Sequence, residues 1–490
     1  MKSILLTLLL FCQYFAYGQG INNNWITGYG GGFGDPDFGE STIDFFTGSA
    51  SISLNHMEMD FRQTHANISD SSGNLLFFTN GYYIADANGD TMLNGTGINP
   101  STFTNMFPDG LTIPQASLII PKPDDSDTYF LFHTTIDTTV PLYAVHFLYL
   151  TEIDMSLNGG KGEVINKNQI VLNDSISIGK ISAVKHGNGR DWWIIIPGTF
   201  SSRYIKLLVT PIGISSVSSQ NIGIHTIPRI GQAGFNNSGN KYFHLDFNGE
   251  IELFDFDRCT GLYSNQILLN TTVGSAGACL SSNDRFLYSS ATDSLFQFDL
   301  TAANVQASQT LVAVYDSFLS AGAFPLPTFF EHMALAPDGK IYMTTGNGTQ
   351  HYHIIDQPDS LGTACNVIQH GLNLGHYYYN TLPNHPNYHL GPLVGSVCDT
   401  VYTGIPPPEE RLTLKLYPSP NSGAFQITYT PLPENLILQV FNILGEEVYS
   451  QLLPQWSQLQ NIYVPNLTAG VYMATITSSA STKSVKFLVE

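Results

Sequence analysis

The sequence predicts an all-β protein: a β-propeller of about seven blades followed by a small immunoglobulin-like antiparallel β-sandwich. Three observations predict this fold. Aromatic residues make up 12% of the chain and charged residues only 12%, with 44 Gly and 26 Pro, a composition that favours strands joined by tight turns. A turn-and-strand phrase recurs along most of the chain, and the C-terminal segment contains several hairpin-like blocks. The length of 490 residues leaves room for two or more domains.

Residues 1–18 are predicted to be a secretory signal peptide. Lys2 gives a positively charged start, residues 4–15 are almost unbroken apolar residues, and Ala16 and Gly18 offer small residues before Gln19. The apolar run is too short to span a bilayer, which takes about 20 residues. No later segment is long and apolar enough, so we predict no transmembrane segment in the mature chain.

Residues 19–403 are predicted to form the propeller. A small-residue or Asp/Asn/Gly turn repeatedly feeds a strand with apolar side chains at alternate positions. Blades arranged in a ring protect the strand edges that would otherwise invite aggregation. At about 40–50 residues for each four-stranded blade, this length predicts about seven blades, with six or eight possible. A pair of stacked β-sandwiches is the alternative. The clearest copies of the phrase lie at residues 70–78, 237–243, 282–288 and 336–343.

Residues 404–411 are predicted to be a linker, and residues 412–490 a separate sandwich. Three consecutive prolines, Pro406 to Pro408, stiffen the linker as an extended, solvated spacer. The sandwich is indicated by strand entries or hairpins, each with its turn residue in place, at residues 416–425, 440–448 and 469–472, and by a final short strand at residues 484–489.

Over its full length this last segment resembles the type A C-terminal sorting domain of the type IX secretion system of Bacteroidetes-type bacteria. The resemblance implies export across the outer membrane, to the medium or the cell surface, with the type IX machinery as partner. Physical reasoning agrees, because Pro418 and Pro420 suit an extended edge entry. Gly445 and Gly470 are expected to relieve turns that a Cβ atom would strain. The sorting-motif residues implied by the resemblance are Tyr417, Pro418, Pro420, Asn421, Gly423, Phe425, Asn442, Gly445, Gly470, Tyr472 and Lys486.

The propeller region also resembles a family, the WD-repeat-like N-terminal region of Bacteroidetes surface proteins. Many members are described as gliding-associated or are uncharacterised, so the resemblance implies a surface location without a defined ligand. The phrases that carry it lie at residues 72–81, 92–95, 115–121, 153–162 and 183–193.

The formal net charge is −20, and its placement is uneven. From Arg411 onward basic and acidic residues balance at four each, so the acidic excess lies in the region before the sandwich. Such a surface repels nucleic acid and anionic membranes, and we predict neither as a partner.

Four cysteines remain after removal of the signal peptide, which contains Cys12. An even number in an exported chain predicts two disulfides, and four cysteines allow three pairings. We favour Cys259–Cys279 and Cys365–Cys398, because each pair flanks a single repeat-like stretch. Buried free thiols are the alternative. The spacing does not fit a zinc site.

Two segments raise the question of metal binding. Asp86–Asp90 has oxygen side chains around a glycine, as in a calcium loop, but the position of the bidentate acid is Gly97. A plain Asx–Gly turn is therefore favoured, and Ca²⁺ is a weak alternative. His351 and His353 could share a metal on one strand face, but no carboxylate motif completes the set. Loop and closure-strand packing is favoured instead for residues 377–379 and 384–389. We predict no metal or cofactor site.

His186 precedes Trp192 and Trp193, which could form a sugar-stacking platform; a turn leading into a buried strand is the favoured reading. The sequence contains no GxSxG elbow and no cysteine beside a plausible base, so we assign no catalytic residue. The predicted function is a non-catalytic binding or adhesion module for a glycan or a surface protein. The alternative is an extracellular glycoside hydrolase or polysaccharide lyase that uses carboxylates in the propeller channel.

Overall fold

A computed structural model describes most of the chain. The described residues are 20–31, 34–137, 144–224, 231–246, 248–271, 274, 277–321, 325–399, 412–430, 432, 434–454, 457, 459–478 and 481–490. The chain divides into two compact units, Met1–Thr400 and Val401–Glu490. The predicted signal peptide and linker lie outside the described residues.

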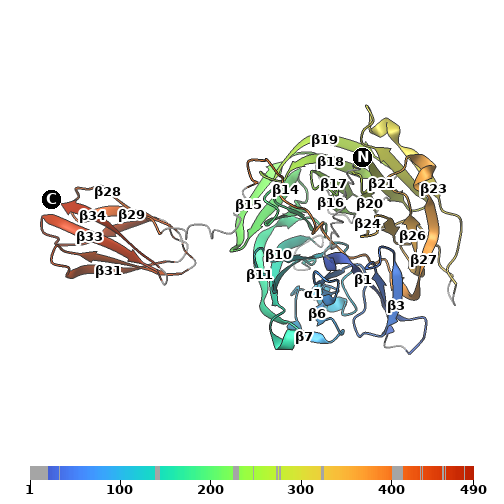
Figure 1. Ribbon diagram of the computed structural model, residues 1–490, viewed down its shortest axis with the longest axis horizontal. Helices are drawn as coiled ribbons and strands as arrows, with labels where there is room; N and C mark the ends of the chain where they lie inside the picture. Colours follow the sequence, from blue (N-terminus) through green and yellow to red (C-terminus); the bar gives the residue numbers. More distant parts are fainter. Residues whose placement is uncertain are drawn as a thin grey trace, which may run out of the picture. The chain divides into compact units, whose positions relative to one another are not determined.

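The first unit is a ring of seven β-sheet blades, as predicted (Figure 1). Blade 1 contains η1 (Gly20–Asn22), β1 (Asn24–Tyr29), β2 (Gly39–Asp44) and β3 (Ser51–Asn55), and blade 2 contains β4 (Ala66–Ser69), β5 (Leu75–Thr79), β6 (Tyr83–Asp86) and β7 (Thr91–Thr96). After α1 (Thr102–Met106), blade 3 contains β8 (Ser117–Pro121), β9 (Thr128–His133), β10 (Val145–Asp154), η3 (Asn158–Gly160) and β11 (Glu163–Ile176).

The remaining blades repeat the four-stranded pattern. Blade 4 contains β12 (Ser182–Lys185), β13 (Trp192–Pro197), β14 (Arg203–Thr210) and β15 (Gly213–Asn221), and blade 5 contains β16 (Ala233–Phe235), β17 (Lys241–Asp246), β18 (Glu250–Asp257) and β19 (Leu262–Asn270). Blade 6 contains β20 (Ala278–Leu280), β21 (Phe286–Ala291), β22 (Ser294–Asp299), η4 (Gln306–Ser308) and β23 (Thr310–Val314). Blade 7 contains β24 (Met333–Leu335), β25 (Ile341–Met343), β26 (Gly348–Ile355), η5 (Gly362–Cys365) and β27 (Val367–Tyr379).

Each blade is an antiparallel meander whose strands pair in sequence order. Blades 2 and 3 are joined into one eight-stranded sheet by a single parallel pairing between Leu93 and Glu163. Among the described residues, the helical segments are short, and none could cross a membrane.

The apolar cores lie between neighbouring blades. Phe243 of blade 5 belongs to one cluster with Leu287 of blade 6, and Trp25 of blade 1 packs with Tyr342 of blade 7. Alternating side chains of each strand thus face one neighbour or the other, and burial of both faces holds each blade in place.

Ring closure occurs where β27 lies against β1 and β2. The Tyr377 N–H donates to the Asp37 carbonyl at 2.9 Å, and the Ser41 hydroxyl donates to the Leu374 carbonyl at 2.7 Å. The first and last blades are therefore joined by hydrogen bonds and by a shared core. Each blade is built only from strands that are consecutive in sequence.

The second unit is a two-sheet sandwich. One sheet has the order β28 (Leu414–Tyr417), β29 (Ala424–Tyr429) and β32 (Leu459–Tyr463); the other has β31 (Glu447–Leu453), β30 (Leu436–Phe441), β33 (Gly470–Thr477) and β34 (Thr482–Val489). Its core includes Phe425, Leu438, Ala474 and Phe487 and is separate from the cores of the ring. Among described residues, these strands pair only with one another, so none completes a blade.

Candidate functional site

The segment of residues 380–399, which we call the strap, crosses the centre of the ring. Asn384 Nδ2 donates to the carbonyls of Ser117 and Ile181, at 3.1 and 2.8 Å, and the Tyr388 hydroxyl donates to the Ile119 carbonyl at 2.8 Å. These partners belong to blades 3 and 4, next to the axis. The favoured sequence reading, loop packing at residues 384–389, is therefore correct.

The strap leaves a central pocket of about 900 Å³. Its walls come from blade 1, from residues in or next to the first strands of blades 3 to 7 and from the strap itself. Rings and aliphatic side chains alternate with neutral amides around it. The apolar lining residues include Trp25, Phe45, Phe46, Phe235, Phe243, Met333 and Leu335, and the amide side chains in the lining include Asn22, Asn23, Gln115, Gln232, Asn237, Asn384 and Asn387.

Two glutamines fix the position of the pocket walls. Gln232 Nε2 donates to the Met333 carbonyl at 3.0 Å, and its Oε1 accepts the N–H groups of Ala278 and Met333. Gln115 Nε2 donates to the Ala233 carbonyl at 2.8 Å, and Gln115 Oε1 accepts the Ala233 N–H at 2.9 Å. The inner strands of blade 5 and of blades 6 and 7 are thereby tied together at the axis.

The described lining of the pocket carries no formal charge. No Asp, Glu, Lys or Arg belongs to its lining within the part of the chain that the structure describes. Burial lowers the pKa of His332 and of His385 to about 4, and also lowers the pKa of His389, so these lining histidines are neutral at pH 7. A site of this kind suits an uncharged ligand.

Carboxylates with raised pKa values lie outside that lining. Burial raises the pKa of Glu40 to about 7. This side chain is inaccessible to solvent, and its Oε2 accepts the Met57 N–H. Burial also raises the pKa of Glu331 to about 7 and that of Asp60 to a smaller extent. None of these carboxylates belongs to the described lining of the pocket.

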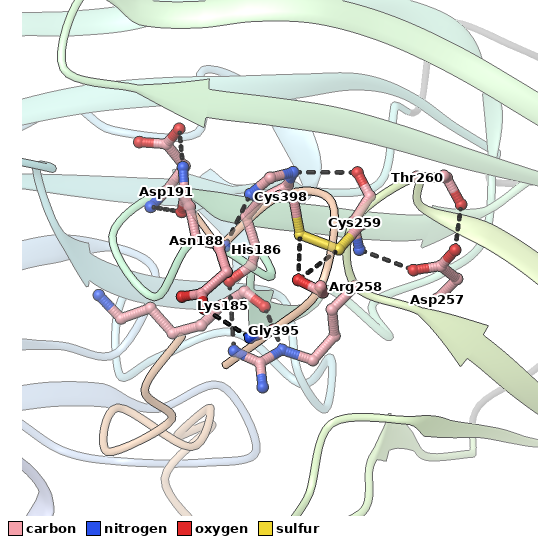
Figure 2. Close-up of a disulfide and its surroundings, with 12 residues drawn as sticks. Lys185, His186, Asn188, Asp191, Asp257, Arg258, Cys259, Thr260, Gly395 and Cys398 are labelled. Atoms are coloured by element: carbon pink, nitrogen blue, oxygen red, sulfur yellow. Dashed lines mark hydrogen bonds between the residues drawn. A yellow bond between two sulfur atoms is a disulfide. The ribbon is translucent and has the colours of Figure 1, made fainter. Parts of the chain in front are cut away.

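The strap ends at a disulfide, which joins Cys398 to Cys259 in the loop after β18 (Figure 2). The expected pairings Cys259–Cys279 and Cys365–Cys398 are wrong. Cys279 and Cys365 are buried free thiols in the core between blades 6 and 7, and burial raises the pKa of Cys279 to about 12. The Cα atoms of the disulfide pair are 5.6 Å apart.

The segment around His186 packs against this disulfide. His186 Nε2 lies 3.0 Å from the Cys259 carbonyl, and Arg258 Nη2 donates to the His186 carbonyl at 3.2 Å (Figure 2). Arg258 Nη2 also donates to the Gly391 carbonyl at 2.7 Å. A Cβ atom at Gly187 would lie 2.3 Å from the Cys398 sulfur, so only glycine fits there. The segment therefore anchors the end of the strap.

Trp192 and Trp193 are 0% and 5% exposed, so they cannot serve as a sugar-stacking platform. Trp193 Nε1 donates to the Arg258 carbonyl at 2.9 Å, which turns this ring toward the loop that carries the disulfide. The favoured reading of the sequence, a turn followed by a buried strand, is confirmed.

The Asp86–Asp90 segment forms the expected Asx turn. Asp86 Oδ1 accepts the N–H groups of Asn88 and Asp90 at 2.9 and 3.2 Å. The ammonium of Lys161 lies 3.3 Å from Asp86 and 3.0 Å from Asp90 and forms an ion pair with each carboxylate.

The histidines singled out in the sequence do not assemble a metal site. His353 Nδ1 accepts the His370 N–H at 2.9 Å and Nε2 faces the Thr328 and Phe329 carbonyls, so neither nitrogen has a lone pair to offer. His351 lies on the same strand, β26, and its ring packs against Phe318. Within the described ranges, no group of three or more His, Cys, Asp or Glu residues is arranged to hold a metal ion.

A buried charged network links blades 4 and 5 away from the pocket. Lys180 forms an ion pair with Asp246 and lies 3.0 Å from His244 Nε2, while the Tyr204 hydroxyl donates to Glu252 at 2.8 Å. Burial lowers the pKa of Lys180; burial of Asp246 acts to raise its pKa, but His244 and Lys180 outweigh this and hold it below its usual range. All five side chains are almost inaccessible, so the network is structural.

In the sandwich, the first sorting motif forms a loop tied to the last strand. Asn421 Nδ2 donates to the Pro418 carbonyl at 3.0 Å, and its Oδ1 accepts the Gly423 N–H at 2.9 Å. The Asn421 backbone N–H and carbonyl bond to Leu488 and Glu490 at either side of Val489. Tyr417, Pro418 and Pro420 remain exposed around this tie.

The other motif residues are spread over the sandwich. Asn442 Oδ1 accepts the N–H groups of Leu444 and Glu446, and Gly445 has a φ of 82°, so both build the turn as expected. The expectation for Gly470 is wrong, because its φ is not positive and a Cβ atom would have no contact closer than 3.9 Å.

Tyr472 and Phe425 face the core, where both pack around Phe487. The Tyr472 hydroxyl donates back to the Thr468 carbonyl at 2.9 Å, in the manner of the tyrosine corner of immunoglobulin-like domains. Lys486 is exposed on β34. The structure thus separates motif residues that build the sandwich from those, Tyr417, Pro418, Pro420 and Lys486, that lie on its surface.

Residues 415–490 match the family described as the secretion system C-terminal sorting domain. This match confirms the prediction for the segment: the protein is exported through the type IX system to the cell surface or the extracellular space, and the sorting domain interacts with the type IX machinery. No protein with a curated description matches the chain.

Among solved structures, the chain is similar to a protein from Lactobacillus plantarum, with 14% identity over 74% of this chain and 99% of that chain and a TM-score of 0.42. It is similar to a putative 6-phosphogluconolactonase from Bacteroides fragilis, with 10% identity over 74% and 97% and a TM-score of 0.40. It is also similar to the β-propeller domain of Cps50 (Swd1) from Myceliophteria thermophila, with 10% identity over 66% and 90% and a TM-score of 0.35.

Proposed function

We propose that this exported protein is a non-catalytic binding module that holds a ligand in the central pocket of its propeller. The observation that carries the proposal is the pocket itself, about 900 Å³ in volume with a neutral lining of rings and amides. Pockets of about 300–1,000 Å³ lined in this way are the usual sites of small ligands. The ligand is a glycan or an exposed part of a surface protein.

We further propose that residues 1–18 are a signal peptide and residues 412–490 the sorting domain, joined to the propeller by the proline-rich linker at 404–411. In this arrangement the propeller is the cargo and the sandwich is its export signal. The acidic excess of the propeller, part of the net charge of −20, favours solubility after release.

The proposal favours binding over catalysis because of the charge of the lining. A hydrolase or lyase acting in this channel would need carboxylates there, and the described lining residues contain none. Neutral histidines of low pKa are poor general bases for a group as weakly acidic as a hydroxyl. The rings and amides of the pocket wall can bind a ligand by shape complementarity and hydrogen bonds.

A pocket-filling variant tests the proposal. Asn23 lines the pocket, and Asn23→Trp would place an indole there. We expect the purified full chain to bind outer-surface polysaccharide and protein extracts of its source bacterium, and Asn23→Trp to lose that binding while keeping the same melting temperature. Binding unchanged in Asn23→Trp, or chemical conversion of the bound material, would contradict the proposal.

A further inference from the structure

One end of the sandwich carries a group of exposed apolar side chains. At this end β33 begins and β34 ends, and Val471 pairs with Leu488 across the two strands. Met473 lies on the same outward face of β33, because side chains two residues apart point to one side of a strand. The turn between β30 and β31 adjoins them, since Phe441 at its start pairs with Met473. We call this group the apolar end; its residues are Ile443, Leu444, Val448, Val471, Met473 and Leu488.

The middle of the same sheet face is polar. Gln439, Thr475 and Ser484 form the next row across β30, β33 and β34. Among the described residues of this face, exposed apolar side chains reappear at the opposite end, with Ile437 and Leu452. Apolar side chains that gather on an exposed surface, rather than lie singly, are typical of interaction sites.

The turn that contributes to the apolar end is held in one conformation. Asn442 Oδ1 accepts the N–H groups of Leu444 and Glu446, at 2.9 and 3.0 Å, and Asn442 Nδ2 donates to the Glu446 carboxylate at 2.8 Å. The side chains of Ile443 and Leu444 are 83% and 80% exposed on this fixed backbone. A turn that is already ordered loses little conformational freedom when a partner covers it.

The apolar end is continuous with the exposed residues of the first sorting motif. The Leu488 N–H donates to Ser419 Oγ at 3.0 Å, and the Leu488 carbonyl accepts the Asn421 N–H at 3.0 Å. These bonds hold the loop that carries the exposed Pro418 and Pro420 beside Leu488. The loop and the apolar end therefore form one surface.

We propose that the apolar end is the surface by which the sandwich docks on the type IX machinery, and that the docking subunit offers an apolar protein surface to it. The match of residues 415–490 to a sorting domain means that the machinery must recognise a surface of this unit. The apolar end supplies area that gains free energy when it leaves water. This inference concerns the sandwich alone and does not depend on the ligand of the central pocket.

Export of the full chain by its source bacterium tests the docking surface. The variants are Met473→Glu and Leu444→Asp, which place a charge in the apolar end. Each should lower the ratio of exported to cell-retained protein about tenfold, because a charge buried against an apolar partner without a counter-charge loses at least that factor in affinity.

Ile437→Glu is the matched control for Met473→Glu. Ile437 and Met473 lie on the same face of the same sheet and are 44% and 42% exposed, but at opposite ends. Ile437→Glu should leave export unchanged. The melting temperatures of the purified variants separate a docking defect from unfolding.

Site-specific crosslinking in the living cell gives a second readout that does not depend on the charge variants. A photocrosslinking amino acid takes the place of Leu444, Met473 or Ile437 in the full chain, and mass spectrometry identifies the crosslinked protein. We expect the first two positions to crosslink to a subunit of the type IX machinery and position 437 not to do so.

The other outcomes would overturn the proposal. Normal export of both Met473→Glu and Leu444→Asp would exclude the apolar end as the docking surface. An equal loss of export in Ile437→Glu, or type IX crosslinks from position 437 alone, would place docking elsewhere on the sandwich. Crosslinks from positions 444 and 473 to a second copy of this chain would assign the surface to self-association instead. If a charge variant unfolds, the crosslinks decide.

Discussion

Removal of the disulfide between Cys259 and Cys398 should destabilise the propeller measurably. The bond closes a loop with a sequence separation of 139, which contains the outer strand of blade 5 and all of blades 6 and 7. The chain-entropy relation gives about 5 kcal/mol for a loop of this length, and native disulfides typically contribute about 2–5 kcal/mol. Unfolding entropy of about 2.1 cal/mol/K per residue amounts to about 0.8 kcal/mol/K over the roughly 380 residues of the ring. The expected fall in melting temperature is therefore about 2–6 °C.

The assay is differential scanning calorimetry of the wild type and the Cys259→Ser/Cys398→Ser variant, each with and without reductant. Reductant should lower the melting temperature of the wild type to that of the variant and leave the variant unchanged. Cys279 and Cys365 remain in both proteins, so they provide the internal control for other thiols. A wild type with the bond verified by mass spectrometry, but a shift below 1 °C, would refute the reasoning.

Three further predictions follow from the buried charges and the sorting domain. Lys180→Met should cost about 3–5 kcal/mol in denaturant unfolding at pH 7, because it removes the ammonium that pairs with the buried Asp246 carboxylate; a cost under 1 kcal/mol would contradict the ion pair. Glu331→Gln should stabilise the ring by up to about 3 kcal/mol at pH 8 and by nothing below pH 4.5. The pKa of Glu331 is about 7 in the folded protein against 4.5 in the unfolded chain. The stability that is present below pH 4.5, where Glu331 is neutral, is therefore lost as the pH rises through 7. Equal effects of the variant at pH 4 and pH 8 would contradict this pKa shift. Asn421→Ala removes two hydrogen bonds and should lower the stability of the isolated residues 412–490 by about 1–3 kcal/mol in urea titration, whereas Lys486→Ala should have little effect.

The ring and the sandwich were predictable from local sequence because both depend on local rules. The turn and strand start at residues 237–243 is typical of a blade, and the structure has this turn followed by β17, which is buried along nearly its whole length. The copies are irregularly spaced, so the number of blades was predicted from the length of the region divided by the typical length of one blade. The same holds for Asn442 and Gly445, whose turn is specified within a few residues.

The disulfide and the pocket were not predictable, because they depend on where the strap returns. Cys398 follows the last blade in sequence but reaches the loop of Cys259 in blade 5 by crossing the axis. Proximity in sequence favoured Cys365 as its partner, whereas Cys365 faces the core between blades 6 and 7. Similarly, Trp25 and His332 are distant in sequence and carry no motif; only ring closure brings them to one wall.

Hydrogen–deuterium exchange of the full chain, with and without the outer-surface polysaccharide and protein extracts that it is expected to bind, tests the central claim most directly. The account predicts slower exchange in residues 382–390 of the strap and in the inner strands β16 and β24, because they line the pocket. Outer strands such as β15 and β19 should exchange at unchanged rates. Protection confined to outer strands or to the sandwich, with no change in the strap, would contradict the claim that the ligand binds at the centre of the ring.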